Sequence, residues 1–197
     1  MYTLYGHVRS RTLRPLWLLE ELGLPYTFVT AAPRSAEARA ASPDGKVPVL
    51  DTPEGRLTES VAMMTYLSDR HGQFTRAAGT FARAQQDALT HTILERLDAL
   101  LWENAKHTLF LPEAQRVAAV FPSLRWQFAQ NGTALADLLG HGPYLLGADP
   151  LVPDFVLAHC AIWALRQDFP LPDALHRHTE MMQARPAFAR AIRQEVP

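Results

Sequence analysis

Two neighbouring residues, Glu59 and Ser60, are suited to hold an amino acid where a predicted strand gives way to a predicted helix. The first N–H groups of a helix lack partners within the helix, and its dipole favours negative charge, so Ser60 suits a carboxylate. The carboxylate of Glu59 suits an ammonium group. Together they match the zwitterionic head of an α-amino acid. The alternative is an ordinary helix start with a capping residue and a helix-favouring acid.

A second candidate, Val47-Pro48, opens another predicted strand and suits an extended peptide. Proline has no N–H for a sheet ladder, so Pro48 must lie at a sheet edge or at the start of a strand. In thioredoxin-like folds such a proline follows a cis peptide bond, and the backbone of the preceding residue pairs with a peptide as an added strand would. The alternative is an edge proline without function.

The third group of candidates lies where the first predicted strand turns into the first helix. The hydroxyls of Tyr5 and Ser10 are candidate donors to an anion at this helix start. The cations Arg11 and Lys46 suit a second carboxylate. The alternative is a strand tyrosine, a capping serine and two surface cations.

The elements that must position these residues occupy the first 76 residues. The pattern predicts strands at Tyr2 to Tyr5, Tyr26 to Thr30, Val47 to Leu50 and Arg56 to Thr58, helices at Arg11 to Leu22 and Ser60 to His71, and a short helix or irregular crossover at Arg34 to Ala41. The first crossover makes the first two strands parallel, and the turn at residues 51–55 makes the last two antiparallel. This order predicts an α/β domain of the thioredoxin-like type.

The rest of the chain, residues 82–197, predicts an all-α helical bundle. One long helix is expected from Phe81 to Leu111 and another from Phe121 to Leu139. The stretch from Asp154 to Arg166 is apolar on nearly all sides, which is typical of a helix in the middle of a bundle.

Composition excludes several classes of function. The 19 basic and 20 acidic residues give a net charge of −1, which argues against nucleic acid as a partner. Apolar runs are too short to span a membrane, and no signal peptide is visible, so a cytoplasmic protein is expected. The single cysteine, Cys160, excludes an intrachain disulfide and a multi-thiolate zinc site, and no metal site is expected.

Three stretches carry a family resemblance: Val8-Arg9-Ser10-Arg11 ahead of Trp17 to Tyr26, Gly45 to Leu50, and Leu57 to Leu67. With these motifs, residues 4–72 resemble the N-terminal domain of the cytosolic glutathione transferases, of bacterial type and of open class. The remainder resembles the helical domain of that family, notably at Tyr144-Leu145-Leu146-Gly147.

The resemblance implies glutathione as a co-substrate and no permanently bound cofactor. It implies that Pro48 is the cis-proline and that Val47 pairs with the cysteinyl backbone of the tripeptide. Glu59 and Ser60 would hold the γ-glutamyl end. The cations Lys46 and Arg11 would lie near the glycine carboxylate.

Two hydroxyl residues are the main candidates to activate the sulfur, and both are kept. Tyr5 stands 18 residues before Gly23, a spacing that resembles the classes with a catalytic tyrosine. Other classes place a serine in the loop before the helix, where Ser10 lies about one residue from the usual register and Arg9 occupies that position. Arg9 or backbone amides are further alternatives. The loop has no cysteine, so a mixed disulfide through an N-terminal thiol is not expected.

The pocket for a second substrate is expected between the domains, along the helix from Phe81 to Leu111. Its candidate residues are Arg9, Trp102, Lys106, His107 and Phe110. The alternatives are core packing for the two aromatic residues and a solvated surface for Lys106 and His107. The residues His159, Cys160 and Trp163 are expected to pack in the core.

The expected activity is attack of the glutathione thiolate on a small hydrophobic electrophile by a homodimeric transferase. One alternative is a glutathione-binding or protein-interaction module without turnover, since a fold does not settle a function. Another is a glutathione-dependent peroxidase or isomerase, which uses the same activated sulfur.

One position departs from the family pattern, which usually has serine or threonine three residues before Asp154. Leu151 occupies that place, so one half of the helix cap is lost. A cap contributes about 1 kcal/mol, so replacing Leu151 by serine is expected to raise the melting temperature by a few degrees.

Overall fold

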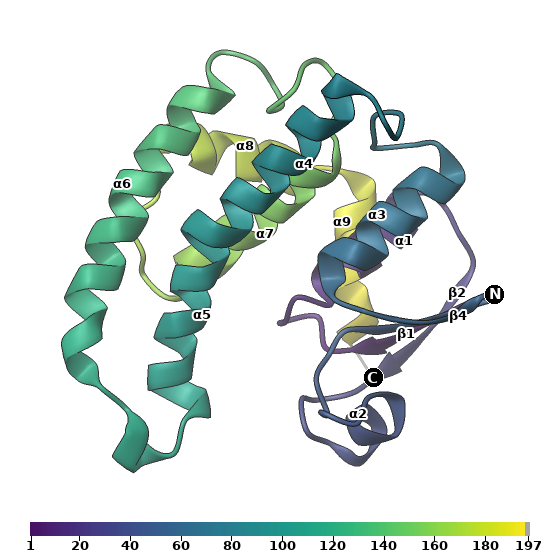
Figure 1. Ribbon diagram of the computed structural model, residues 1–197, viewed down its shortest axis with the longest axis horizontal. Coiled ribbons are helices and arrows are strands. Elements are labelled where there is room, and N and C mark those ends of the chain that lie inside the picture. The colour runs from purple at the N-terminus through teal and green to yellow at the C-terminus, as the bar shows by residue number, and fades with distance from the viewer. Residues whose placement is uncertain (196–197) are drawn as a thin grey trace. The chain divides into compact units, whose positions relative to one another are not determined.

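The computed structural model describes residues 1–195 and divides into two compact units (Figure 1). The first unit comprises Met1–Ala78 together with the chain from Met182 onward, and the second comprises Gly79–Met181. The domain limits expected from the sequence, 1–76 and 82–197, stay a prediction, and residues 196–197 lie outside the described residues.

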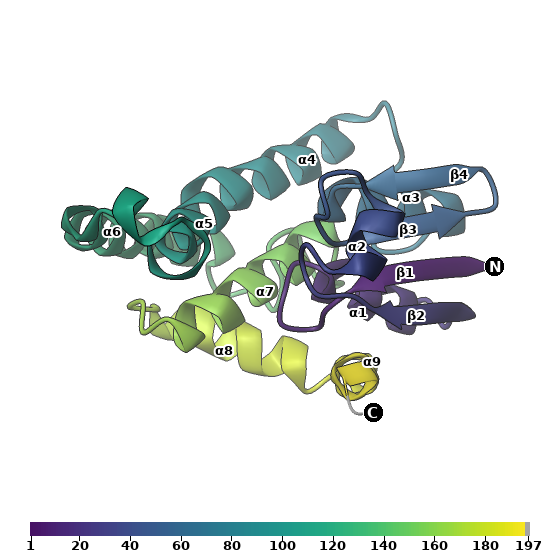
Figure 2. The same cartoon turned by 90° about the horizontal axis from the view of Figure 1, so that it is seen from below.

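The first unit is built on a four-stranded mixed sheet with the order β2-β1-β3-β4. Its strands are β1 (Tyr2–Gly6), β2 (Tyr26–Thr30), β3 (Val49–Thr52) and β4 (Gly55–Thr58). The pair β1–β2 is parallel, and β3 runs antiparallel to both β1 and β4. Helices α1 (Leu13–Glu21) and α3 (Ser60–His71) lie on one face of the sheet, and α2 (Ala36–Ala41) lies on the other (Figure 2). The predicted thioredoxin-like α/β arrangement is confirmed.

The core of this unit lies between the sheet and the helices α1 and α3. Leu4 and Leu50 of the sheet are fully buried, and so are the following apolar side chains of the two helices: Leu16, Leu19, Met63, Met64 and Leu67. Full burial of one such side chain contributes about 1.5–3 kcal/mol. The residues whose apolar spacing predicted these helices are therefore the residues that are buried against the sheet.

A C-terminal helix, α9 (Pro186–Ile192), packs against α1 of the first unit. The rings of Trp17 and Phe188 lie 4.8 Å apart in an edge-to-face arrangement. The Nε atom of Arg185 donates to Glu21 at 2.6 Å, and the Nε atom of Arg190 donates to Glu20 at 2.7 Å. The chain end thus returns to the sheet-containing unit, which short-range sequence patterns do not indicate.

The second unit is helical throughout its regular elements, as predicted. They are α4 (Phe81–Ile93), α5 (Ala99–Ala105), α6 (Phe121–Leu139), α7 (Val152–Arg166) and α8 (Asp173–Gln183), with 3-10 turns at Glu113–Gln115 and Ala118–Val120; a further 3-10 turn, Arg193–Glu195, follows α9. Helix α7 is buried along most of its length and packs against α4, as its apolar sequence predicted.

The single helix expected from Phe81 to Leu111 is wrong in detail, because π-helical turns at Leu94–Asp98 and Lys106–Phe110 interrupt it. The fully buried residues Ile93, Leu97 and Leu101 recur every four positions. Four residues overshoot one α-helical turn of 3.6 residues, so this spacing drifts around a regular helix. A wider π turn brings such residues back to one side.

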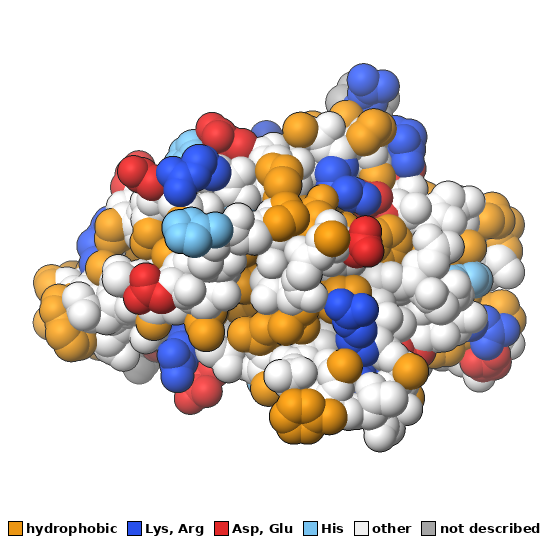
Figure 3. Space-filling view, turned by 90° about the horizontal axis from the view of Figure 1, so that it is seen from above, with side chains coloured by type: hydrophobic (Ala, Val, Ile, Leu, Met, Phe, Trp, Pro, Cys, Tyr) orange, Lys and Arg blue, Asp and Glu red, His pale blue; other side chains and the backbone are white. Residues whose placement is uncertain are grey.

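The surface of the molecule carries charges of both signs. On the face drawn in Figure 3, basic and acidic side chains are interspersed, in keeping with the net charge of −1. Among the described residues, no helix has both the length and the apolar character needed to cross a bilayer.

Asp154 joins α7 to the loop before it. Its fully buried carboxylate accepts hydrogen bonds from the backbone N–H of Leu145 at 2.9 Å and of Leu151 at 2.8 Å, and His178 Nε2 lies 3.2 Å away. The carboxylate therefore caps α7 without a side-chain oxygen at Leu151.

The burial of Leu151, which is 4% exposed, reverses the expectation drawn from its sequence position. A serine there would add a cap of about 1 kcal/mol but would lose burial of a leucine, about 2–3 kcal/mol. We expect Leu151→Ser to lower the melting temperature by a few degrees in a thermal melt followed by circular dichroism. Leu138→Ser, at a position 54% exposed, is the control and should change it little. A higher melting temperature for Leu151→Ser would contradict this account.

Candidate functional site

The sheet register brings the candidate residues to one edge of the first unit. Tyr5 pairs with Val49, and Val49 pairs with Thr58, so the three form one row across β1, β3 and β4. Because β3 runs against its neighbours, the end of β1, the start of β3 and the end of β4 meet at the same edge. Residues that are more than 50 positions apart in the chain, such as Tyr5 and Ser60, thereby share one end of the sheet.

Val47 presents backbone groups beyond the end of the ladder. The Val47–Pro48 peptide bond is cis, and β3 begins only at Val49. Within residues 1–195, no backbone hydrogen bond pairs the N–H or C=O of Val47. The preceding loop is held by Gly45, whose carbonyl accepts from Arg34 N–H at 2.7 Å. An extended peptide can pair with Val47 as a further strand would.

Glu59 occupies a backbone conformation that side chains rarely adopt, with φ of 67° and ψ of 114°. It connects β4 directly to α3, and its side chain is exposed. Its carboxylate has neither a hydrogen bond nor an ion pair with any residue that the structure describes. Uncommon backbone conformations of this kind cost of order 1–3 kcal/mol and cluster at binding sites, so an unpaired charge here is a candidate ligand contact.

Ser60 is the first residue of α3 and is 5% exposed. Its Oγ accepts a hydrogen bond from Arg14 NH1 at 3.3 Å. The buried hydroxyl thus lies where the unpaired N–H groups of the helix begin. Arg14 was not among the residues selected from the sequence, and its place between Leu13 and Pro15 gives no signal of chemistry.

The candidate cations lie in the two loops of this edge. Lys46 precedes Val47, is exposed, and forms no ion pair among residues 1–195. Arg11 is half-buried in the turn that leads into α1. Arg9 is exposed, and its backbone N–H donates to His7 Nδ1 at 3.2 Å.

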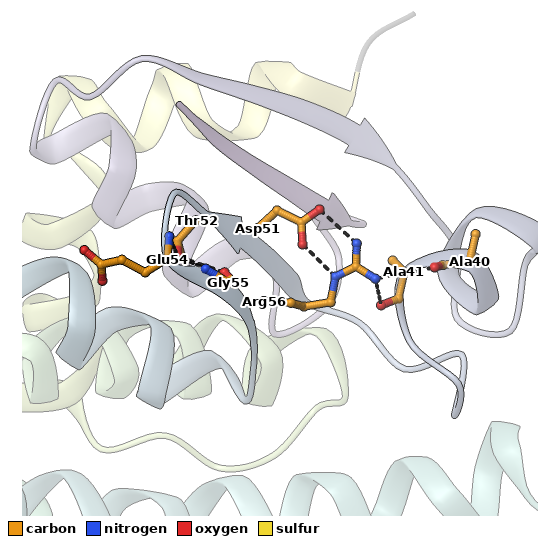
Figure 4. A network of polar contacts seen from close by, with 7 residues as sticks. All are labelled: Ala40, Ala41, Asp51, Thr52, Glu54, Gly55 and Arg56. Atoms are coloured by element: carbon orange, nitrogen blue, oxygen red, sulfur yellow. Dashed lines mark hydrogen bonds and ion pairs between the residues drawn. The ribbon is translucent and has the colours of Figure 1, made fainter.

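Tyr5 lies beside an ion pair of the sheet. The guanidinium carbon of Arg56 lies 5.9 Å from the centroid of the Tyr5 ring. Arg56 binds both carboxylate oxygens of Asp51, at 2.6 and 2.9 Å, and reaches the carbonyl of Ala41 at 2.7 Å (Figure 4). The hydrogen bond from Arg56, with a smaller contribution from Tyr5, holds the pKa of Asp51 below its usual range. The carboxylate of Asp51 is therefore a nearby acceptor that competes with a sulfur for the Tyr5 hydroxyl.

Ser10 belongs to a compact hydrogen-bonded turn. Its hydroxyl donates to the carbonyl of His7 at 2.7 Å and lies 2.8 Å from Thr12 Oγ1, which in turn accepts from His7 N–H at 3.3 Å. Gly6 makes this turn possible, because a Cβ there would lie 2.0 Å from Thr12 Oγ1. Gly6 and Thr12 were given no role from the sequence. The signal was a glycine followed by the hydroxyl residues Ser10 and Thr12 before a helix, which indicates a tight turn.

Four of the five residues expected to bind the second substrate lie at the end of α5 and in the π turn that follows: Trp102, Lys106, His107 and Phe110. The rings of Trp102 and Phe110 are 5.1 Å apart. Glu103 pairs with Lys106 Nζ at 2.6 Å and with His107 Nε2 at 3.1 Å, and the hydrogen bond from Lys106 is the main cause of its lowered pKa. The pocket itself, and the part of Arg9 in it, stay a prediction.

A separate polar cluster lies inside the helical unit. It consists of Asp98, His159 and Cys160, which are all buried and whose potential ligand atoms lie within 4.8 Å of one another. Cys160 Sγ is 4.0 Å from Asp98 Oδ2, whereas the sulfur and oxygen ligands of a tetrahedral zinc ion stand about 3.6 Å apart. The spacing is that of a long hydrogen bond to sulfur. Cys160 thus has a polar partner as well as the packing role expected from the sequence.

The fold and the candidate site together define a thioredoxin-like domain, at one edge of which Val47, Glu59 and Ser60 meet, joined to a helical unit. Residues 4–75 match the family model described as the N-terminal domain of glutathione S-transferase. The bacterial glutathione transferase BphK, solved as a ternary complex, is 25% identical, with a TM-score of 0.87 over 98% of each chain. A comparison of the sequence with curated proteins finds no match.

Other solved structures share the fold. A glutathione transferase from Methylococcus capsulatus is 23% identical, with a TM-score of 0.85 over 99% of this chain and 98% of that one. A family member from Pseudomonas fluorescens, solved with two glutathione bound, is 20% identical, with a TM-score of 0.81 over 100% of this chain and 93% of that one. Residues 4–75 therefore match the N-terminal domain of the glutathione S-transferase family, as the sequence motifs indicated, and the chain as a whole shares the fold of bacterial glutathione transferases.

The pKa of Asp51 offers a test of how firmly Tyr5 and Arg56 are held. Arg56→Met should raise this pKa toward its usual value, and Tyr5→Phe should raise it less, because Arg56 is the larger cause. Carboxyl titration by NMR measures both shifts, with Arg83→Met in α4 as the control.

The depressed pKa of Asp51 also links it to stability. Its contribution is present above the pKa of the unfolded chain, about 3.9, and is lost as pH falls through the lower pKa of the folded protein. The free energy of unfolding should therefore fall less steeply with acid in Arg56→Met than in the wild type. An Asp51 pKa that is the same in Arg56→Met and in the wild type would contradict the assigned cause.

Proposed function

We propose that this protein is a glutathione transferase, in which a bound glutathione thiolate attacks a small hydrophobic electrophile. The observation that carries the proposal is the convergence of Val47, Glu59 and Ser60 at one edge of the sheet. The match of residues 4–75 to the family's N-terminal domain and the glutathione bound to the Pseudomonas relative support the tripeptide as the ligand.

In this proposal the tripeptide lies extended beside Val47. The cysteinyl N–H and C=O pair with the backbone of Val47, which no described residue occupies. The γ-glutamyl ammonium binds the carboxylate of Glu59, and its carboxylate binds Ser60 and the first N–H groups of α3. Lys46 and Arg11 neutralise the glycine carboxylate.

The sulfur then lies near the turn between β1 and α1, where it must lose its proton. A free thiol has a pKa of about 8.5, and lowering it by about two units takes about 2.7 kcal/mol. One hydrogen bond to the thiolate together with the start of a helix supplies about this much. The thiol proton leaves to solvent, and the thiolate forms a bond from sulfur to the electrophilic carbon, from which the leaving group departs.

The structure supports Ser10 over Tyr5 as the donor to the thiolate, although the sequence spacing favours Tyr5. Ser10 would give up a neutral carbonyl, that of His7, to donate to sulfur. Tyr5 lies beside the carboxylate of Asp51, which competes with a sulfur for its hydroxyl, and hydrogen bonds to charged acceptors are roughly twice as strong. Donation to the sulfur therefore costs less at Ser10.

The active form is proposed to be a homodimer. Trp102 and Phe110 are proposed to line the pocket for the electrophile. Their paired rings at the end of α5 offer apolar surface to such a substrate. Lys106 and His107 are less suited to contact it, because both are already paired with Glu103.

Binding of the γ-glutamyl end is tested by Glu59→Gln and Ser60→Ala. Each removes one charge-assisted contact worth about 1.5–3 kcal/mol, so the dissociation constant for glutathione should rise roughly ten- to hundred-fold in isothermal titration calorimetry. Glu54→Gln, at an exposed carboxylate in the β3–β4 turn, is the matched control and should bind as the wild type does. Undiminished binding by the double variant Glu59→Gln/Ser60→Ala would remove the basis of the proposal.

Sulfur activation is tested by Ser10→Ala and Tyr5→Phe in an aryl-halide conjugation assay. Ser10→Ala should lower kcat at least ten-fold and raise the pKa of bound glutathione, measured by its thiolate absorbance, while the dissociation constant for glutathione stays near the wild-type value. Tyr5→Phe should have the smaller effect. The reverse ranking would assign the role to Tyr5, and binding without turnover in the wild type would favour a non-catalytic module.

A further inference from the structure

We propose that Arg14 is a positioning residue for the γ-glutamyl carboxylate, acting through the hydroxyl of Ser60. This inference rests on the proposed function, because it concerns how the same subsite recognises its ligand. Arg14 lies on α1, and Ser60 is the first residue of α3. The contact therefore joins two helices that pack side by side on one face of the sheet.

The burial of Arg14 is the first observation. Its side chain is 1% exposed, in the first turn of a helix whose other buried residues, Leu13, Pro15, Leu16 and Trp17 among them, are apolar. Arginine is almost never fully buried unless its charge is paired, because removing the charge from water is costly. An apolar side chain of similar volume would fill the same space at a lower cost in desolvation free energy.

The direction of the contact is the second observation. Arg14 NH1 donates to Ser60 Oγ at 3.3 Å, and a guanidinium has no acceptor. The oxygen of Ser60 therefore uses one of its own lone pairs to accept this hydrogen bond, and its proton must point elsewhere. A serine held in this way presents its O–H as a donor, which is what a carboxylate at the start of α3 requires.

Charge adds to this orientation. The guanidinium lies next to the helix end where the dipole of α3 is positive and where N–H groups have no partner within the helix. Because the site is screened from water, a positive charge there acts on a bound carboxylate more strongly than an exposed one would. The chemistry that Arg14 and Ser60 select together is therefore an α-carboxylate beside an ammonium group, as in the γ-glutamyl head.

A purely structural role for Arg14, as a link between α1 and α3, makes a different prediction. Loss of a structural link weakens every ligand of the site alike. Loss of a positioning residue weakens only ligands that carry the α-carboxylate. The two roles are separated by comparing glutathione with 4-aminobutyryl-cysteinyl-glycine, which lacks that carboxylate and is otherwise the same.

The experiment measures both dissociation constants by isothermal titration calorimetry for the wild type, Arg14→Met and Ser60→Ala. The wild type should prefer glutathione by about ten-fold or more, as expected for a hydrogen bond to a charged group. Arg14→Met and Ser60→Ala should each lose most of this preference, and the double variant should lose no more than Ser60→Ala alone. Arg96→Met, at an exposed arginine of the helical unit, should keep it.

The outcomes separate this inference from the proposed function. A wild type that binds neither ligand, or binds both equally, overturns the proposed γ-glutamyl site. A wild-type preference that persists in Arg14→Met, or an equal weakening of both ligands by that substitution, overturns the role of Arg14 alone. If Arg14→Met does not fold, Arg14→Gln and Arg14→Lys decide: a reduced preference in either supports the role, and a wild-type preference in both overturns it.

Discussion

The antiparallel pairing of β3 with β1 and β4 is the constraint on which the site depends. It aligns Tyr5, Val49 and Thr58 in one row, so that the three chain segments that continue from this row meet at one edge. A register shift of one residue would turn every side chain of β3 to the opposite face. Either direction of shift is costly, because it moves the buried Leu50 to the partly exposed position of Asp51 or moves Asp51 to the buried position of Leu50. Core packing thus sets the geometry of the binding edge.

The charges at this edge are arranged to leave a place for a ligand. Glu59 and Lys46 have no ionic partner among residues 1–195, whereas Asp51 and Arg56 on the same sheet neutralise each other. One free charge of each sign suits a ligand that carries both an ammonium and a carboxylate. The hydroxyls differ, since that of Ser10 already has an acceptor and Tyr5 lies beside the carboxylate of Asp51. Binding can therefore be preorganised while activation of the sulfur requires an exchange of partners.

Much of the first unit could be predicted from the sequence, because its signals are local. Apolar spacing marks α1 and α3, and the turn at residues 51–55 marks the β3–β4 hairpin. The parts that could not be predicted depend on partners distant in the chain. The docking of α9 on α1, the position of Tyr5 beside Arg56 and the burial of Leu151 are of this kind. The π turns were missed because a repeat of four residues also fits an α-helix within its tolerance.

Arg14 is a single residue whose surroundings could not be predicted from the sequence. In the sequence it stands near the start of a helix, where a cation is ordinarily solvated, and only the packing of α1 against α3 reveals that it is buried beside Ser60. Helix α1 then serves both ends of the proposed ligand. The turn through Ser10 and Thr12 at its start lies near the sulfur, and Arg14, on its first turn, contacts the residue that receives the γ-glutamyl carboxylate. Because Ser10 lies in a hydrogen-bonded turn that leads directly into the helix that carries Arg14, the conformation of this one segment sets the distance between the two proposed subsites.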